Sequence, residues 1–135
     1  MPGIIPDVNI EGHFRILVRL LNEDWRREIW TWLNWRTATF QELGLAPNAS
    51  DLIVWKRCQT EQFVLLTGNR NQKDSDSLEA VIRTLNTPES FPVFTLGQPT
   101  RFLTDRIYAA RVANSTLEHA FDIMNHLGSG RVFLP

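Results

Sequence analysis

Six acidic and amide side chains of this 135-residue chain stand directly after apolar segments or at an expected helix start. They are Asp7, Asp51, Asn69, Asn71, Asp74 and Asp76. In open parallel sheets, the residues that follow the strands meet at one edge of the sheet, which is where ligands bind. Carboxylate and amide oxygens are the donors that Mg²⁺ and Mn²⁺ prefer. The pattern therefore predicts a site for one of these cations, held by the four aspartates.

Most of these residues also have an ordinary structural interpretation. Asp51 could cap the N-terminus of the helix that it begins. Asp74 and Asp76 could belong to a solvated loop or cap the next helix. Asn69 and Asn71 could occupy left-handed turn positions, which asparagine tolerates. Only the joint placement of all six residues near one sheet edge favours a site over these alternatives.

Apolar spacing predicts the elements that must position these side chains. Short, continuously apolar runs at 63–67 and 91–96 are typical of buried parallel strands, with weaker strand candidates at 4–5, 37–40 and 131–134. Helical spacing predicts helices over 12–21, 25–35, 51–60, 77–85, 100–112 and 115–127. The last helix is expected to face the core with Leu117, Ala120, Phe121 and Met124. The alternation predicts an α/β fold, a three-layer α/β/α sandwich with a mostly parallel central sheet.

Size and composition exclude several classes of protein. The length fits a single domain over residues 1–135 that buries a core without disulfides or metals. The one cysteine, Cys58, excludes an internal disulfide and a cysteine-based zinc finger. A formal net charge of -1 argues against a basic protein that coats nucleic acid. No apolar run reaches about 18 residues and the first residues lack a signal-peptide pattern, so we expect a cytoplasmic protein without a membrane partner.

Four of the five tryptophans fall within residues 25–35. In the helix expected there, Trp25, Trp30 and Trp32 offer more aromatic surface than one helix can bury against a small core. Because tryptophan is favoured at protein interfaces, these three residues are predicted to contact a second copy or another protein. Packing in the core is one alternative. Stacking on nucleic-acid bases is another, because arginines are interleaved with the rings.

Three segments of the chain resemble the small PIN-like proteins related to toxin ribonucleases. They are 40–45 (FQELGL), 49–51 (ASD) and 63–71 (FVLLTGNRN). The resemblance covers about residues 4–96, and the tail over 92–135 is similar to uncharacterised cyanobacterial members of that group. It implies an α/β/α sandwich in which clustered carboxylates bind Mg²⁺ or Mn²⁺ and hydrolyse RNA phosphodiesters.

The resemblance also implies roles for single residues. Asp7 would be the acidic residue after the first strand, and Asp51 the acidic residue at the helix start. Asn69 and Asn71 stand where the group has two later aspartates. Asparagine supplies a carbonyl oxygen without a charge, so this site would lack two negative charges.

Two interpretations of the site follow. In the first, Asp76 completes a catalytic set with Asp7 and Asp51, and Asp74 adds a further metal ligand. The two asparagines would then orient water or a phosphate, and Arg70 would contact the nucleic-acid backbone. In the second, the PIN-like fold has lost catalysis and acts as a scaffold, through dimerisation or association with another protein.

Overall fold

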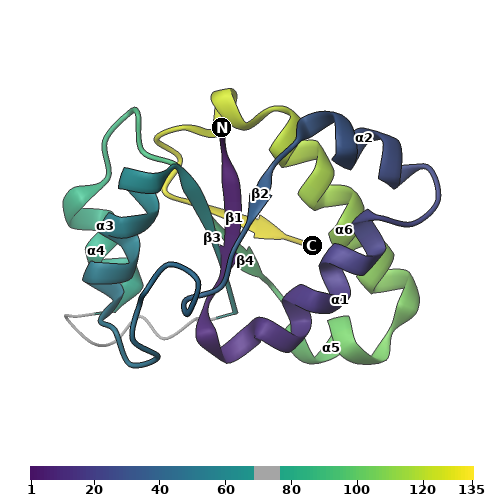
Figure 1. Cartoon of the computed structure of the whole chain (residues 1–135), viewed down its shortest axis with the longest axis horizontal. Coiled ribbons are helices and arrows are strands. Elements are labelled where there is room, and N and C mark those ends of the chain that lie inside the picture. Colours follow the sequence, from purple (N-terminus) through teal and green to yellow (C-terminus); the bar gives the residue numbers. More distant parts are fainter. Residues whose placement is uncertain (69–76) are drawn as a thin grey trace.

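The structure is a computed structural model that describes residues 1–68 and 77–135. In that part, five parallel strands form one sheet in the order β2-β1-β3-β4-β5 (Figure 1). The strands are β1 (Gly3–Pro6), β2 (Arg36–Thr37), β3 (Phe63–Thr67), β4 (Val93–Leu96) and β5 (Arg131–Leu134). The α-helices are α1 (Glu11–Leu21), α2 (Arg26–Leu33), α3 (Asp51–Glu61), α4 (Leu78–Leu85), α5 (Pro99–Thr104) and α6 (Arg106–Phe121). Two short 3₁₀ helices, η1 (Val8–Ile10) and η2 (Ile123–His126), complete the described elements.

Consecutive strand residues alternate between two apolar cores, one on each face of the sheet. On one face, Ile4 and Leu66 pack in a core that includes residues of α1 and α6. On the other face, Ile5 and Leu65 pack with residues of α3 and α4. These two helices lie together on one side of the sheet (Figure 1). Burial of both faces explains why the strands read as continuous apolar runs. The predicted α/β/α sandwich is confirmed, and the described sheet is parallel throughout.

The strands that follow β1 in the chain lie on opposite sides of it, β2 on one side and β3 on the other. From β1 the chain passes through α1 and α2 to β2, and then through α3 to β3 on the other side of β1. Gly3 accordingly lies between Arg36 of β2 and Phe63 of β3 in the strand register. A Cβ at Gly3 would lie 2.5 Å from the Phe63 ring, so this position requires glycine. The carboxyl ends of β1 and β3 therefore form the topological switch point, where open α/β sheets bind their ligands.

The helix boundaries near the C-terminus differ from the prediction. Helices were expected at 100–112 and 115–127, but residues 113–114 lie inside α6 and the break between α5 and α6 is at Asp105. The Asp105 carboxylate caps α6 by accepting hydrogen bonds from the N–H groups of Ile107 and Tyr108, at 3.0 and 3.1 Å. This cap is a local signal for a helix start that the apolar spacing did not contain. Neither α6 nor any other described helix is long and apolar enough to cross a membrane.

The end of α6 differs from the prediction in which side chains it buries. Leu117 and Ala120 are buried as expected, whereas Phe121 and Met124 are exposed. The α-helix ends at Phe121 and the chain continues into η2, so the 3.6-residue repeat does not carry Met124 inward. Phe121 lies on the outside, with its ring stacked on that of Trp32 at a centroid distance of 5.7 Å.

Candidate functional site

Asp7 and Asp51 line the same pocket at the carboxyl edge of the sheet. The pocket has a volume of about 170 Å³ and lies among the ends of β1 and β3, the loop before α3, and the first turns of α3 and α4. Its other lining residues are Val8, Asn9, Phe40, Pro47, Ala49, Val54, Leu65 and Leu78. The structure therefore brings together two carboxylates that lie on separate elements of the chain.

The backbone holds Asp7 at the switch point. Its N–H donates a hydrogen bond to the carbonyl oxygen of Leu66, in the neighbouring strand β3, at 2.8 Å. Burial raises the pKa of the Asp7 carboxyl above its ordinary value. Hydrogen bonds from the N–H groups of Asn9 and Val8 and with the Thr67 side chain act in the opposite direction and are smaller effects. The Asp7 carboxyl is thus directed into a partly dry site.

Asp51 begins α3, but its carboxylate is not the cap of that helix. The cap is the hydroxyl of Ser50, which accepts a hydrogen bond from the N–H of Ile53 at 3.3 Å. This geometry removes the main alternative explanation for an acidic residue at position 51. The Asp51 side chain instead lines the pocket, where its carboxylate accepts a hydrogen bond from the N–H of Leu78.

The charges of the two aspartates act on each other. Burial is the largest cause that raises the pKa of the Asp51 carboxyl, and the negative charge of Asp7 raises it further. The N–H of Leu78, at the start of α4, and the positive charge of Arg131 lower it. Two partly buried carboxylates repel each other when both are ionised, and this repulsion destabilises their charged forms. A bound divalent cation would relieve the repulsion.

Arg131 also belongs to this region, although its position in the sequence did not indicate it. It begins β5, and its guanidinium donates to Glu79 Oε2 through Nε at 3.2 Å and to Thr95 Oγ1 through Nη1 at 2.6 Å. Its side chain is only 10% exposed. Glu79 lies 52 residues away in the chain, so local spacing could not have predicted the pair. The available signal was a lone arginine at the start of an apolar terminal strand.

Two carboxylates are a suitable donor set for Mg²⁺. Among residues 1–68 and 77–135, no group of three or more His, Cys, Asp or Glu side chains is arranged to hold a metal. Mg²⁺ is commonly bound by only one or two carboxylates, with water and substrate phosphates as its other ligands. The remaining predicted site residues, Asn69, Arg70, Asn71, Asp74 and Asp76, lie outside the described residues.

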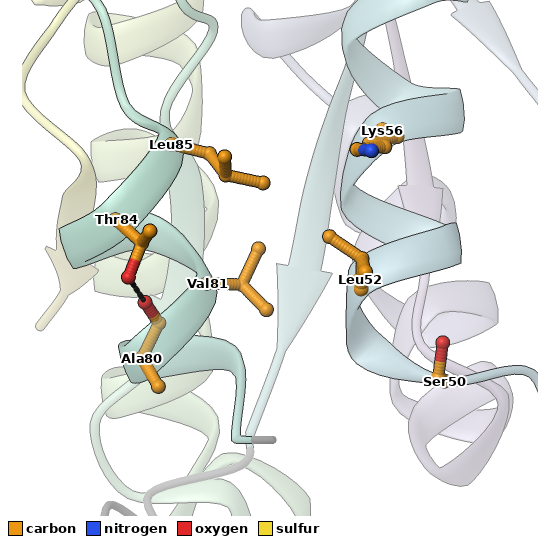
Figure 2. A pocket seen from close by; sticks show the side chains of 7 residues that line it. All are labelled: Ser50, Leu52, Lys56, Ala80, Val81, Thr84 and Leu85. Atoms are coloured by element: carbon orange, nitrogen blue, oxygen red, sulfur yellow. Dashed lines mark hydrogen bonds between the residues drawn. The ribbon is translucent and has the colours of Figure 1, made fainter. Parts of the chain in front are cut away.

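A larger groove of about 500 Å³ lies between α3 and α4, and Figure 2 shows the side chains that line it. They are Ser50, Leu52, Lys56, Ala80, Val81, Thr84 and Leu85. Lys56 is the one ionisable group among these described residues. The Ser50 hydroxyl caps α3, and the Thr84 hydroxyl donates to the Ala80 carbonyl at 2.8 Å, the bond drawn in Figure 2. These lining side chains supply no acid–base pair, so the candidate site is the pocket of Asp7 and Asp51.

Cysteine does not supply a competing site in the described part of the chain, and two of the three histidines pack against each other. Cys58 is buried, and burial raises the pKa of its thiol to about 12, so no reactive thiolate forms at neutral pH. The rings of His119 and His126 lie close together, with centroids 4.8 Å apart. His119 is anchored through Nδ1, which lies 2.7 Å from the Ser115 carbonyl oxygen.

The three tryptophans predicted at an interface lie in different environments. Trp30 is buried in the core, where its ring is tilted against that of Trp35 at 6.3 Å. Its ring is therefore not available to a partner surface, because folding of the single chain already buries it. Trp25 and Trp32 are exposed.

Comparison with known protein families, with curated proteins and with solved structures found no match to this chain.

Proposed function

We propose that this chain is a PIN-like ribonuclease that uses Mg²⁺ or Mn²⁺ to hydrolyse RNA phosphodiesters in the cytoplasm. The observation that carries the proposal is the convergence of Asp7 and Asp51 in one pocket at the switch point of a parallel sheet. Burial raises the pKa of both carboxyls. Perturbed carboxyl groups in a cleft are typical of functional sites.

Each residue has a separate role in this proposal. Asp7 and Asp51 hold the cation, Asp76 is the third carboxylate of the catalytic set, and Asp74 is a further ligand. A bound cation supplies two things that phosphodiester hydrolysis needs, a more acidic water and neutralisation of phosphate charge. Asn69 and Asn71 orient water or a phosphate, and Arg70 contacts the RNA backbone.

The size of the pocket supports a substrate that presents a phosphate. Its volume of about 170 Å³ is below the roughly 300–1,000 Å³ of pockets that enclose drug-sized ligands. A phosphate and a cation that has lost part of its water are groups of this scale, whereas the base and sugar would remain outside. Contacts to the phosphate backbone carry little sequence information, so we expect weak sequence preference.

Arg131 acts as a positioning residue in this proposal. Its guanidinium is already engaged by Glu79 and Thr95, so it is not free to grip a substrate phosphate. Its charge nevertheless lowers the pKa of Asp51 and so favours the ionised carboxylate that a cation needs.

A second candidate function is a PIN-like scaffold that has lost catalysis and acts by association. Two observations favour it. Asn69 and Asn71 replace the aspartates that the resemblance leads one to expect, and Trp25 and Trp32 are exposed. In this case the carboxylate pocket is a remnant, and the surface of α2 performs the function.

Cleavage of single-stranded RNA with Mn²⁺ distinguishes the two functions. The assay compares the wild-type chain with Asp7→Asn and with Glu23→Gln, a control at an exposed carboxylate outside the pocket. We expect cleavage that a chelator abolishes, that Asp7→Asn slows at least about 100-fold, and that Glu23→Gln leaves unchanged. Equal residual cleavage by wild type and Asp7→Asn overturns the ribonuclease and favours the scaffold.

A further inference from the structure

Two of the three histidines lie together where α6 ends. His119 is in the last turn of α6, and His126 is the last residue of η2. The helix α6 carries the chain back from the end of β4 to the start of β5, so both histidines lie toward the edge of the sheet at which the strands begin (Figure 1). Asp7 follows the opposite end of β1. The histidine pair is therefore separate from the carboxylate pocket.

The end of α6 brings the two rings together. In a continuous α-helix, residues seven apart are separated by about 10.5 Å along the axis. Here the α-helix ends at Phe121 and the chain turns into η2, which leaves the centroids of the His119 and His126 rings only 4.8 Å apart. The loop after η2 is held in place, because the Gly128 N–H donates a hydrogen bond to the Ser90 carbonyl oxygen at 2.9 Å. The fold thus fixes the backbone on both sides of the pair.

His119 has the tautomer and the fixed ring that a metal ligand needs. Its Nδ1 lies 2.7 Å from the Ser115 carbonyl oxygen, and a carbonyl oxygen can only accept, so Nδ1 carries the proton. The lone pair of the neutral ring is then on Nε2. The ring also packs edge-on against Phe94 of β4, with centroids 5.9 Å apart. Histidines that bind metals are commonly held in this way, by a backbone carbonyl at the other ring nitrogen.

The spacing of the two rings fits two imidazoles on one ion. With a metal–nitrogen bond of about 2.0–2.1 Å, a ring centroid lies about 3.2 Å from the ion. Two such rings with centroids 4.8 Å apart subtend about 95–100° at the ion, between the angles of octahedral and tetrahedral coordination. The ring planes are inclined by 56°, whereas rings stacked in parallel planes could not share an ion that lies in both planes.

We propose that His119 and His126 together bind a divalent transition-metal ion of the Zn²⁺, Ni²⁺ and Cu²⁺ class. Neutral imidazole suits these ions, whereas Mg²⁺ and Mn²⁺ favour oxygen ligands, so this site and the carboxylate pocket select different metals. His119 binds through Nε2, and rotation of the His126 ring about its Cβ–Cγ bond presents either of its nitrogens.

The number of protein ligands sets the character of this site. Within residues 1–68 and 77–135, no third His, Cys, Asp or Glu side chain joins the pair, so water completes the coordination. The ion is therefore exchangeable rather than permanently enclosed. It joins the end of α6 to the segment that leads into β5, and so stabilises the folded chain. The site does not depend on catalysis at Asp7 and Asp51.

NMR of the imidazole nitrogens during a Zn²⁺ titration tests the site. The measurement uses the ¹⁵N-labelled chain without an affinity tag, and it reads each histidine separately, so Zn²⁺ bound elsewhere does not interfere. We expect the signals of His119 and His126 to shift together with one Kd, with His119 responding at Nε2. His126→Gln should weaken the response of His119 at least about 10-fold, because it removes one of two protein ligands.

The matched control is His13→Gln, which removes the histidine of α1 whose ring lies against Phe102. It should leave the response of the pair unchanged, and so should Asp7→Asn. In His126→Gln, the His13 signals report whether the chain is still folded. Wild-type His119 and His126 signals that Zn²⁺ leaves unchanged overturn the proposal. A shift of only one of the two rings also overturns it, as does an undiminished response of His119 in His126→Gln, because each outcome means binding to a single histidine.

Discussion

Asp7 and Asp51 lie on different elements, yet their carboxyl groups share one pocket, and the charge of Asp7 raises the pKa of Asp51. The fold places them there because β1 ends and α3 begins at the switch point of the sheet. Asp7 directly follows β1, and Asp51 is the first residue of α3. Such an arrangement costs stability unless a cation or a proton neutralises it. This cost is measurable as a difference in the free energy of unfolding.

Replacing Asp7 should change the pH dependence of stability. Burial raises the pKa of Asp7 in the folded chain above the ordinary value of 3.8, so the folded chain retains this proton to higher pH than the unfolded chain does. The folded state is therefore destabilised as pH rises from about 3.8 through the folded pKa. Asp7→Asn removes this loss. Urea unfolding in a chelator should show Asp7→Asn gaining stability over wild type between pH 4 and pH 7. A difference in the free energy of unfolding that stays the same at every pH would contradict a raised pKa of Asp7.

A bound metal ion should reverse the stability difference between wild type and Asp7→Asn. A cation that binds only the folded chain adds about 2.7 kcal/mol when its free concentration is 100 times its Kd. We therefore expect Mn²⁺ to raise the melting temperature of wild type and a chelator to lower it again. Asp7→Asn should respond much less, and the control Glu23→Gln should respond as wild type does. An equal response of wild type and Asp7→Asn would place the bound metal elsewhere.

The cap of α3 and the site carboxylate should be separable by mutation. Ser50→Ala removes the hydroxyl that accepts from the Ile53 N–H, and it should lower the free energy of unfolding by about 1 kcal/mol. Asp51→Asn leaves this cap in place and relieves repulsion from Asp7, so it should not destabilise the metal-free protein. Denaturant unfolding of both variants is the measurement. An equal loss of stability in Ser50→Ala and Asp51→Asn would mean that the Asp51 side chain stabilises α3 and is not a ligand of the site.

The ion pair of Arg131 and Glu79 should contribute more to stability than an exposed pair. Arg131→Met leaves Glu79 and Thr95 without their partner in a region where Arg131 is only 10% exposed. Because the Glu79 side chain is 32% exposed, water compensates part of the loss, and we expect about 1–3 kcal/mol.

The matched control for this pair is Arg57→Met. It removes a pair with Glu61 in which Nε and Oε2 are 3.1 Å apart, as Nη2 and Oε2 are in the Arg131 pair, but in which 40% and 34% of the two side chains are exposed. Like Arg131→Met it also removes a second hydrogen bond, here from Arg57 to the Leu43 carbonyl oxygen. Surface pairs of this kind contribute about 0–1 kcal/mol. Similar losses in Arg131→Met and Arg57→Met would show that burial does not strengthen the first pair.

Local signals in the sequence were sufficient for much of the fold. The apolar run at 63–67 coincides with β3, and the predicted helix over 51–60 is α3 because Ser50 caps it. The break between α5 and α6 was not predicted, because it depends on one capping carboxylate, Asp105, within a stretch that reads as helical. The exposure of Phe121 depends on where α2 packs, which apolar spacing alone does not contain.

The candidate site was accessible from the sequence only in part. Proximity of Asp7 and Asp51 could be anticipated, because residues at strand ends and helix starts of a parallel sheet meet at one edge. Arg131 could not be placed there, because its relation to Glu79 and Asp51 depends on the pairing of β5 with β4. That pairing joins segments far apart in the chain, and no local pattern encodes it.

Diffraction from crystals soaked in Mn²⁺ tests the central claim most directly, because manganese gives an anomalous signal that locates it without reference to activity. We predict one strong anomalous peak between the carboxylates of Asp7 and Asp51, and its loss in crystals of Asp7→Asn. A pocket without such a peak, at Mn²⁺ concentrations that support RNA cleavage, would contradict the assignment of these two aspartates as metal ligands.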